Sequence, residues 1–154
     1  MTAGYTIRRI SKDDYEGVID TLKVLTVVGD VSRRRFEEIV DHWDAVYLHG
    51  TSTRQYNPLV VVEDATGQIA ATGNIILERK LIHDAGLCGH IEDIAVSKSH
   101  QGKRLGKFLI DRLTQLGFEA GCYKIILDCD PKNVPFYEKC GYSKAGIEMQ
   151  IRRD

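Results

Sequence analysis

A basic segment that contains glycine occupies positions 97–107, between a predicted strand and a predicted helix. Free backbone N–H groups at a helix start, together with the helix dipole, suit a phosphate or pyrophosphate. Lys98, Lys103, Arg104 and Lys107 add positive charge. The segment is neither a P-loop nor a dinucleotide fingerprint, because it lacks G-x-x-x-x-G-K-[ST] and G-x-G-x-x-G. It predicts an anion-binding loop, with a solvated basic loop as the alternative.

Carboxylates stand in or directly after two apolar runs. Asp128 ends the run 124–127, and Glu92 and Asp93 lie within the run 90–96. Ligands of open α/β sheets bind beyond the carboxyl ends of the strands, which makes Asp128 a candidate ligand-binding residue. Glu92 and Asp93 form a second acidic pair, and a capping or salt-bridging role is the alternative for each.

The cysteines predict neither a zinc site nor a redox pair. Cys88, Cys122, Cys129 and Cys140 form no C-x-x-C pair. We expect them to be reduced and buried as small apolar side chains. No His, Cys, Asp or Glu cluster has metal-ligand spacing along the sequence, so we expect no metal.

Length and composition are those of one domain, which we expect to span residues 1–154. The chain has 154 residues, of which 43% are hydrophobic and 28% charged, enough to enclose one core. A formal net charge of -1 argues against nucleic acid as a main partner. No apolar run reaches the roughly 18 residues of a membrane span, and the N-terminus has no apolar signal region, so we expect a cytoplasmic protein.

The hydrophobic pattern predicts a mixed α/β fold. Helices capped by Ser11, Ser32 and Asn133, and one that follows the basic loop, separate the strands. The predicted strands are 5–10, 58–63, 69–81, 90–96, 123–128, 142–145 and 148–152. Consecutive hairpins make the first neighbours antiparallel, and the crossover through the basic loop and its helix makes one pair parallel. Helices are expected on both faces.

The basic loop resembles that of a known superfamily. Glu-Asp-Ile-Ala-Val followed by Gln101 and Gly106 at a helix start resembles [QR]-x-x-G-x-[GA], the acetyl-CoA loop of the GCN5-related N-acetyltransferases. Arg104 stands where that pattern has its middle glycine, which places a side chain near the pyrophosphate instead of bare backbone. Residues 136–142, Phe-Tyr-Glu-Lys-Cys-Gly-Tyr, resemble the superfamily's F-Y-x-x-x-G-[FY].

Flanking segments resemble the branch that acetylates glucosamine 6-phosphate. They are 21–26, 71–74, 89–93, 122–124 and 133–141. The resemblance spans nearly the whole chain. It implies a mixed, mostly antiparallel central sheet with helices on both faces and a splayed parallel strand pair. It also implies acetyl transfer from acetyl-CoA to the 2-amino group of glucosamine 6-phosphate, in UDP-N-acetylglucosamine biosynthesis.

The same resemblance implies roles for individual residues. Tyr137 protonates the departing thiolate, which suits a phenol, while Asp128, Glu92 or water serves as base. The residues implied to bind acetyl-CoA are Ile94, Ala95, Val96, Gln101, Gly102, Lys103, Arg104, Leu105, Gly106, Lys107, Asn133 and Tyr137. Those implied to bind the sugar phosphate are Thr26, Lys80, Leu81, Ile82, His83, Glu92, Asp93, Ile94, Tyr123, Lys124, Asp128 and Arg152.

The closing segment 148–152 alternates as a strand. A strand left at a sheet edge exposes unpaired N–H and C=O groups. The resemblance implies that this segment is exchanged across a two-fold homodimer with shared active sites. Arg152 would then act either in its own site or in that of the partner.

Three other functions are compatible with parts of this pattern. The first is an acetyltransferase of the same fold that acts on another small amine. The second is a non-catalytic acyl-CoA-binding module, against which the intact Tyr137 and Asp128 argue. The third is a nucleotide-binding interaction protein, which the missing P-loop disfavours.

Overall fold

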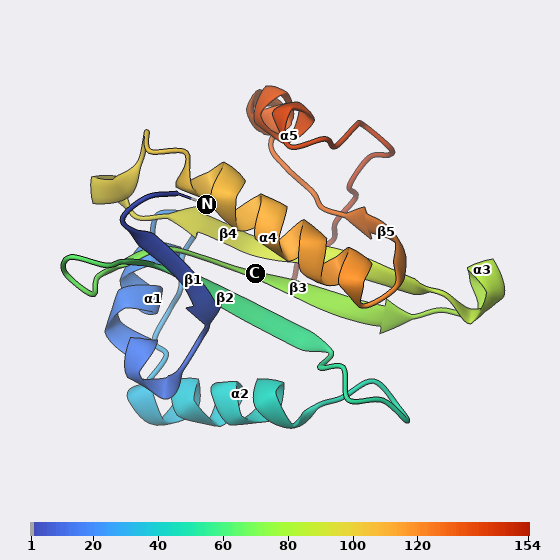
Figure 1. The fold of residues 1–154 in the computed structure, drawn as a ribbon, viewed down its shortest axis with the longest axis horizontal. Coiled ribbons are helices and arrows are strands. Elements are labelled where there is room, and N and C mark those ends of the chain that lie inside the picture. Colours follow the sequence, from blue (N-terminus) through green and yellow to red (C-terminus); the bar gives the residue numbers. More distant parts are fainter. Residues whose placement is uncertain (1) are drawn as a thin grey trace.

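The central sheet has five strands in chain order (Figure 1). The computed structural model describes residues 2–154. The strands are β1 (Tyr5–Arg9), β2 (Tyr56–Glu63), β3 (Ile69–Arg79), β4 (Leu87–Val96) and β5 (Cys122–Ile126). Neighbours are antiparallel except for β4 and β5, which are parallel. This confirms the expected mixed, mostly antiparallel sheet.

Helices cover both faces of the sheet (Figure 1). They are α1 (Tyr15–Leu22), α2 (Arg33–Ala45), α3 (Ile82–Ala85), α4 (Leu105–Glu119) and α5 (Val134–Lys139), with the short 3-10 turns η1 (Lys12–Asp14), η2 (Lys98–His100) and η3 (Pro131–Asn133). Val60 packs with Phe36 of α2, whereas its neighbour Val61 packs with Leu109 of α4. Successive strand residues point to opposite faces, so α2 and α4 lie on opposite sides. In residues 2–154 we find no helix with the length and apolar character that a membrane span requires.

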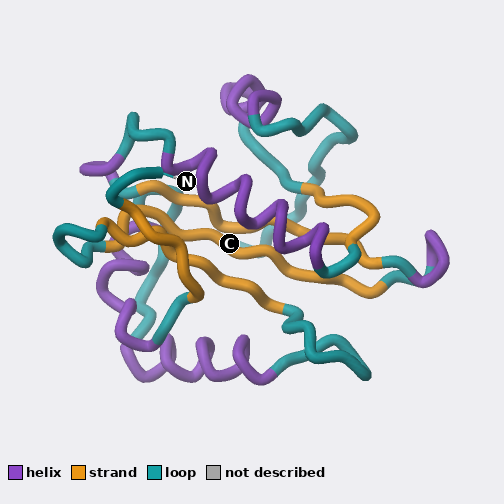
Figure 2. The backbone as a smooth tube through the Cα atoms, viewed as in Figure 1, coloured by secondary structure: helices purple, strands orange, loops and turns teal. Residues whose placement is uncertain are grey.

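The parallel pair is short and opens at one end. β4 and β5 pair from Leu87 and Cys122 only as far as His90 and Ile126, although β4 continues to Val96. Beyond Ile126 the chain leaves the sheet and leads to η3 and α5 (Figure 2). The backbone of β4 beyond His90 therefore faces an opening on this side, which confirms the expected splay.

A β-bulge lies in β4 at this opening. The register between β3 and β4 shifts by one at Gly73, which faces both Asp93 and Ile94. Asp93 has a φ of +56°, a left-handed conformation that costs a non-glycine residue about 1–2 kcal/mol. The bulge lays Ile94 over Gly73, where any Cβ would overlap the Ile94 side chain. Glycine is therefore required at position 73 by close approach, not by backbone conformation.

The prediction of two closing strands is wrong within a single chain. Residues 142–154 belong to neither a helix nor a strand. The reason is that an extended segment becomes a strand only when another strand pairs with it, and β5 ends the sheet at this side. Ile147, Met149 and Ile151 alternate along the segment and are 92%, 91% and 99% exposed. One apolar face of this C-terminal segment is thus uncovered in the chain.

Replacing Gly73 by alanine should lower the free energy of unfolding by about 1–3 kcal/mol, the usual cost of overpacking. The added Cβ overlaps Ile94 and lies 3.2 Å from Leu109 and 3.3 Å from Leu113. Urea denaturation measures the change. Gly146→Ala is the matched control, because a Cβ there meets nothing within 4 Å. Equal stability of the two variants would contradict this account.

Candidate functional site

A cleft of about 530 Å³ lies where β4 and β5 diverge. One wall is the β4 segment 91–94, and the opposite wall is the segment 127–131 with Asn133 and the following α5. Leu25 and Glu148 complete the lining. The predicted residues that the structure brings together here are Glu92, Asp93, Ile94, Asp128, Asn133 and Tyr137.

Glu92 has an acidic neighbour beside it on β4 and another on the opposite wall of the cleft. Its pKa is raised, first by partial burial of the carboxyl and then by the charges of Asp93 and Asp128. The sign follows from the cause, because both burial and nearby negative charge disfavour the ionised form. Glu92 therefore holds its proton to higher pH than an ordinary glutamate does. The negative charge of Asp128 on the opposite wall contributes to this shift of the Glu92 pKa.

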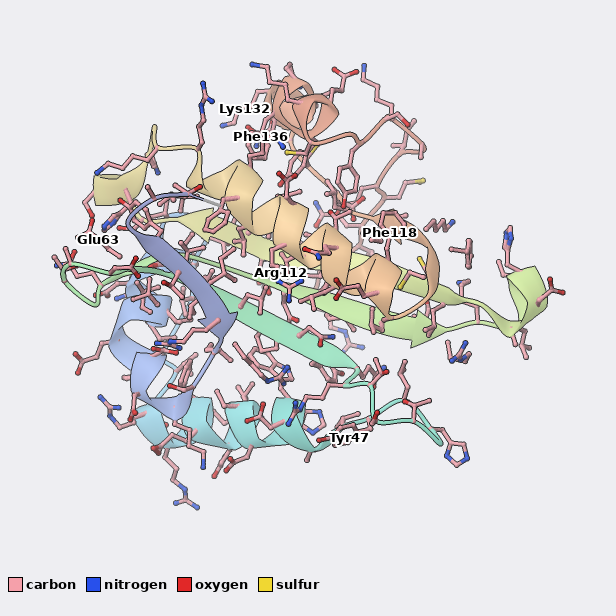
Figure 3. All side chains as sticks on the ribbon, in the orientation of Figure 1. Tyr47, Glu63, Arg112, Phe118, Lys132 and Phe136 are labelled. Carbon is pink, nitrogen blue, oxygen red and sulfur yellow. The ribbon has the colours of Figure 1, made fainter. Side chains whose placement is uncertain are left out.

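Tyr137 places a half-buried phenol in the same cleft. Burial raises its pKa, and the nearby thiols of Cys129 and Cys140 raise it further. Its ring meets Phe136 edge to face at 4.9 Å between centroids. Phe136, labelled on α5 in Figure 3, also lies 3.1 Å from the position that a Cβ on Gly106 would take. Tyr137 is therefore a protonated hydroxyl at neutral pH, on a helix that packs against the start of α4.

The basic loop enters α4 through left-handed residues. Gly102 has a φ of +79° and Arg104 a φ of +62°, and Arg104 is the N-cap residue of α4. This conformation explains the glycine of the superfamily pattern, since an L side chain pays about 1–2 kcal/mol for it. The Gln101 amide donates to the Val96 carbonyl at 3.3 Å and ties the loop to the end of β4. Residues 101–104 are all exposed.

His100 holds this loop to the sheet, a role that the sequence did not predict. The ring is 4% exposed, with Nε2 3.1 Å from Glu63 Oε2 and Nδ1 3.0 Å from Ser99 Oγ. Glu63 lies at the sheet end next to the loop (Figure 3) and also accepts a 3.3 Å hydrogen bond from Tyr5. No sequence signal marks this contact, because it joins positions 37 residues apart.

Most residues predicted to bind the sugar phosphate lie elsewhere. Within residues 2–154, eight of them are not part of the lining of the cleft: Thr26, Lys80, Leu81, Ile82, His83, Tyr123, Lys124 and Arg152. His83 stacks on Tyr123 with ring centroids 4.1 Å apart, and Lys124 Nζ lies 5.7 Å from the same ring. His83 belongs to α3, which lies next to the start of β4 (Figure 1), and Tyr123 and Lys124 belong to the part of β5 that pairs with that start. The lining of the cleft instead takes residues 91–94 from the second half of β4. Arg152 pairs with Asp154 at 3.0 Å in the C-terminal segment.

The cysteines only partly follow the prediction. Cys88 and Cys122 are free and buried, as expected for small apolar side chains. The prediction is wrong for Cys129, which is exposed and lines the cleft because the chain has already left the sheet there. Cys140 is half-buried. The lining residues Leu25, Ile91, Leu127, Asp130, Pro131 and Glu148 were likewise not predicted.

The model of the acetyltransferase (GNAT) family matches residues 19–142. The chain belongs to this family. The matched region of this GNAT acetyltransferase contains β4, the basic loop, α4, β5 and α5. All walls of the cleft, apart from Glu148, therefore lie within it.

Individual relatives are similar to this acetyltransferase along nearly its whole length. It is 48% identical over 153 residues to a glucosamine 6-phosphate N-acetyltransferase of Candida albicans, covering 99% of the chain and 98% of the relative. It is 39% identical to the protein of the same name from Arabidopsis thaliana, with 97% of each covered. The crystal structure of glucosamine-6-phosphate N-acetyltransferase from Arabidopsis thaliana superposes with a TM-score of 0.89 at 36% identity, over 97% of this chain and 99% of that one.

Removing the charge of Asp128 should lower the pKa of Glu92, because that charge is one of the causes that raise it. We expect Glu92 to titrate at lower pH in Asp128→Asn than in the unaltered chain. The measurement is the carboxyl carbon chemical shift of Glu92 followed by NMR against pH. Asp130→Asn is the control, since Asp130 lines the same cleft but is not among the charges that raise the Glu92 pKa. Equal shifts in both variants would contradict the assignment.

Proposed function

We propose that this protein is a glucosamine 6-phosphate N-acetyltransferase. It transfers the acetyl group of acetyl-CoA to the 2-amino group of glucosamine 6-phosphate and yields N-acetylglucosamine 6-phosphate and CoA, a step towards UDP-N-acetylglucosamine. The observation that carries the proposal is 48% identity along 99% of the chain to a relative of that name. The cytoplasm, where these charged metabolites occur, is the proposed location.

The residues present fit acetyl-CoA. On the open side of β4, the backbone of Ile94, Ala95 and Val96 is unpaired by β5 and offers hydrogen bonds to an amide-containing arm. The start of α4 offers free N–H groups, and Lys103 and Arg104 add charge, which together suit a pyrophosphate. When bound, acetyl-CoA supplies a reactive thioester, and this chain supplies position and proton transfer.

Proton transfer falls to the groups that share the cleft. An amine attacks only in its unprotonated form, so a base or a water chain must accept its proton. Asp128 and Glu92, which both line the cleft, are the carboxyl groups proposed for this, and each can also hold the amine by a hydrogen bond. Tyr137 keeps its proton at neutral pH because burial raises its pKa. It is the proposed donor to the sulfur that leaves as CoA.

The sugar phosphate requires positive charge that this cleft does not supply. In the described part of the chain, the lining contains the acids Glu92, Asp93, Asp128, Asp130 and Glu148 and neither lysine nor arginine. A phosphate dianion is repelled by such a wall. Lys80, Lys124 and Arg152 lie outside this lining, and a second copy of the chain would bring some of them to the open side of the cleft.

The C-terminal segment supports a homodimer in which sites are shared. Ile147, Met149 and Ile151 form an uncovered apolar face, and β5 is an unpaired sheet edge. Exchange of this segment between two copies would cover the apolar face and give the edge strand β5 a hydrogen-bonding partner. It also carries Arg152 to the neighbouring molecule. A homodimer would thus supply both the strand that the C-terminal segment needs as a partner and the positive charge that the cleft lacks.

The function is tested by release of CoA from acetyl-CoA with a panel of amines. We expect glucosamine 6-phosphate to be used in preference to glucosamine, spermidine and a peptide N-terminus. Preference for another amine would replace the proposal with an acetyltransferase of different substrate. Binding of acetyl-CoA without release of CoA to any amine would replace it with a non-catalytic binding module.

Tyr137→Phe should lower kcat by about 10²–10⁴-fold, the usual contribution of general acid catalysis. Binding of acetyl-CoA, measured by calorimetry, should be nearly unchanged, because the ring remains. Tyr142→Phe is the control, since its hydroxyl bonds Thr114 at 2.6 Å and lies outside the lining of the cleft. Unchanged turnover of Tyr137→Phe at every pH would contradict its role as acid.

Mixing two inactive variants tests the shared sites. If Asp128 and Arg152 of one site come from different chains, exchange between Asp128→Asn and Arg152→Ala dimers should restore about a quarter of the unaltered activity. The control is a mixture of Asp128→Asn and Glu92→Gln. It should restore no activity, because Asp128 and Glu92 line the cleft of the same chain, so every cleft in the mixed dimer lacks one of them. No recovery despite confirmed exchange, or an active monomer in sedimentation, would refute sharing.

A further inference from the structure

Three side chains of metal-binding type converge on one face of the sheet, outside the cleft. Glu78 of β3 stands directly opposite Cys88 of β4. The two-residue period of a strand places His90 on the same face as Cys88. One ligand atom from each of the three lies within 4.8 Å of the other two. The closest pair is His90 Nε2 and Glu78 Oε1, at 2.9 Å.

The chemistry of these groups selects the ion. Thiolate, imidazole and carboxylate are the ligands that Zn²⁺ uses in proteins, and three of them leave a fourth position open to water. Mg²⁺ and Ca²⁺ prefer oxygen ligands and do not suit a thiolate. Ligand atoms of a tetrahedral zinc lie about 3.3–3.8 Å apart, given Zn–ligand bonds of about 2.0–2.3 Å. Small side-chain rotations would therefore close this cluster on one ion.

The cluster has a buried floor and an open mouth. Cys88 is 1% exposed, whereas the side chains of His90 and Glu78 are 31% and 49% exposed. Burial raises the pKa of the Cys88 thiol, although the charge of Lys124 acts in the opposite direction. The thiol therefore keeps its proton until a cation displaces it. Lys80, with Nζ 3.4 Å from Glu78 Oε1, competes with the cation for the carboxylate.

We propose that Glu78, Cys88 and His90 form a binding site for one divalent ion of the Zn²⁺ class. The ion is held by the thiolate sulfur, the imidazole Nε2 and a carboxylate oxygen, and water takes the fourth position. On binding, the thiol proton passes to solvent and a metal–sulfur bond forms, with no change in oxidation state. The site does not depend on the proposed acetyl transfer, because none of the three residues is used in it.

Co²⁺ added to the reduced full-length chain tests the site, because a thiolate ligand gives an intense charge-transfer absorption. We expect one Co²⁺ per chain, displaced by Zn²⁺, and one Zn²⁺ per chain by calorimetry. Cys88→Ser should abolish the charge-transfer absorption, while Cys129→Ser, which alters an exposed thiol outside the cluster, should retain it. Absence of the absorption in the unaltered chain, or its loss only in Cys129→Ser, would overturn the proposal.

A second variant covers the case in which Cys88→Ser fails to fold. His90→Gln changes a partly exposed ring and keeps a hydrogen-bond donor towards Glu78. We expect it to weaken Zn²⁺ binding at least about tenfold, since loss even of a group that only supports a metal ligand typically costs about 10–100-fold in affinity. Circular dichroism confirms that the variant is folded. Zn²⁺ binding by folded His90→Gln as tight as in the unaltered chain would also overturn the proposal.

Discussion

Pairing between β4 and β5 stops at His90 and Ile126, and the cleft exists because of that stop. A parallel pair needs a crossover, and here α4 provides it while its apolar side bears on the sheet. Leu105, Leu109 and Leu113 are at most 1% exposed, so α4 is held firmly. Because the core under α4 holds this part of the fold together, β5 can separate from β4 after Ile126. The cost is that several backbone groups of β4 have no strand partner on that side.

Charge is distributed unevenly around this opening. The walls carry acids, while the positive groups lie at the loop before α4, near α3 and in the C-terminal segment. An acidic wall suits an amine that must be held and deprotonated, and it repels phosphate groups towards the edges. In the proposed reaction, the amine and the phosphate of one substrate would thereby be oriented in opposite directions. The same arrangement explains why a single chain offers suitable binding groups for acetyl-CoA but too little positive charge for the sugar phosphate.

Local patterns were sufficient to predict much of the fold. Alternation and apolar runs located the five strands, and the position of Asp128 after an apolar run placed it in the cleft. Alternation is insensitive to a one-residue shift, however, so the bulge at Asp93 was not visible. The contact of His100 with Glu63, and that of Glu78 with Cys88, depend on which residues face each other across strands. The C-terminal segment failed as a strand because, within residues 2–154, no strand of the sheet pairs with it.

If acetyl-CoA binds along the open backbone of β4, as proposed, its supply affects the stability of the protein. In the proposed binding mode, a cosubstrate arm along residues 91–96 would take the place of a missing strand, so it would bind the folded chain and not the unfolded one. At a hundredfold excess over its Kd, such a ligand adds about 2.7 kcal/mol to folding stability. Changes of that size alter how often a chain unfolds and is degraded in a cell. The amount of this protein would then rise and fall with acetyl-CoA itself.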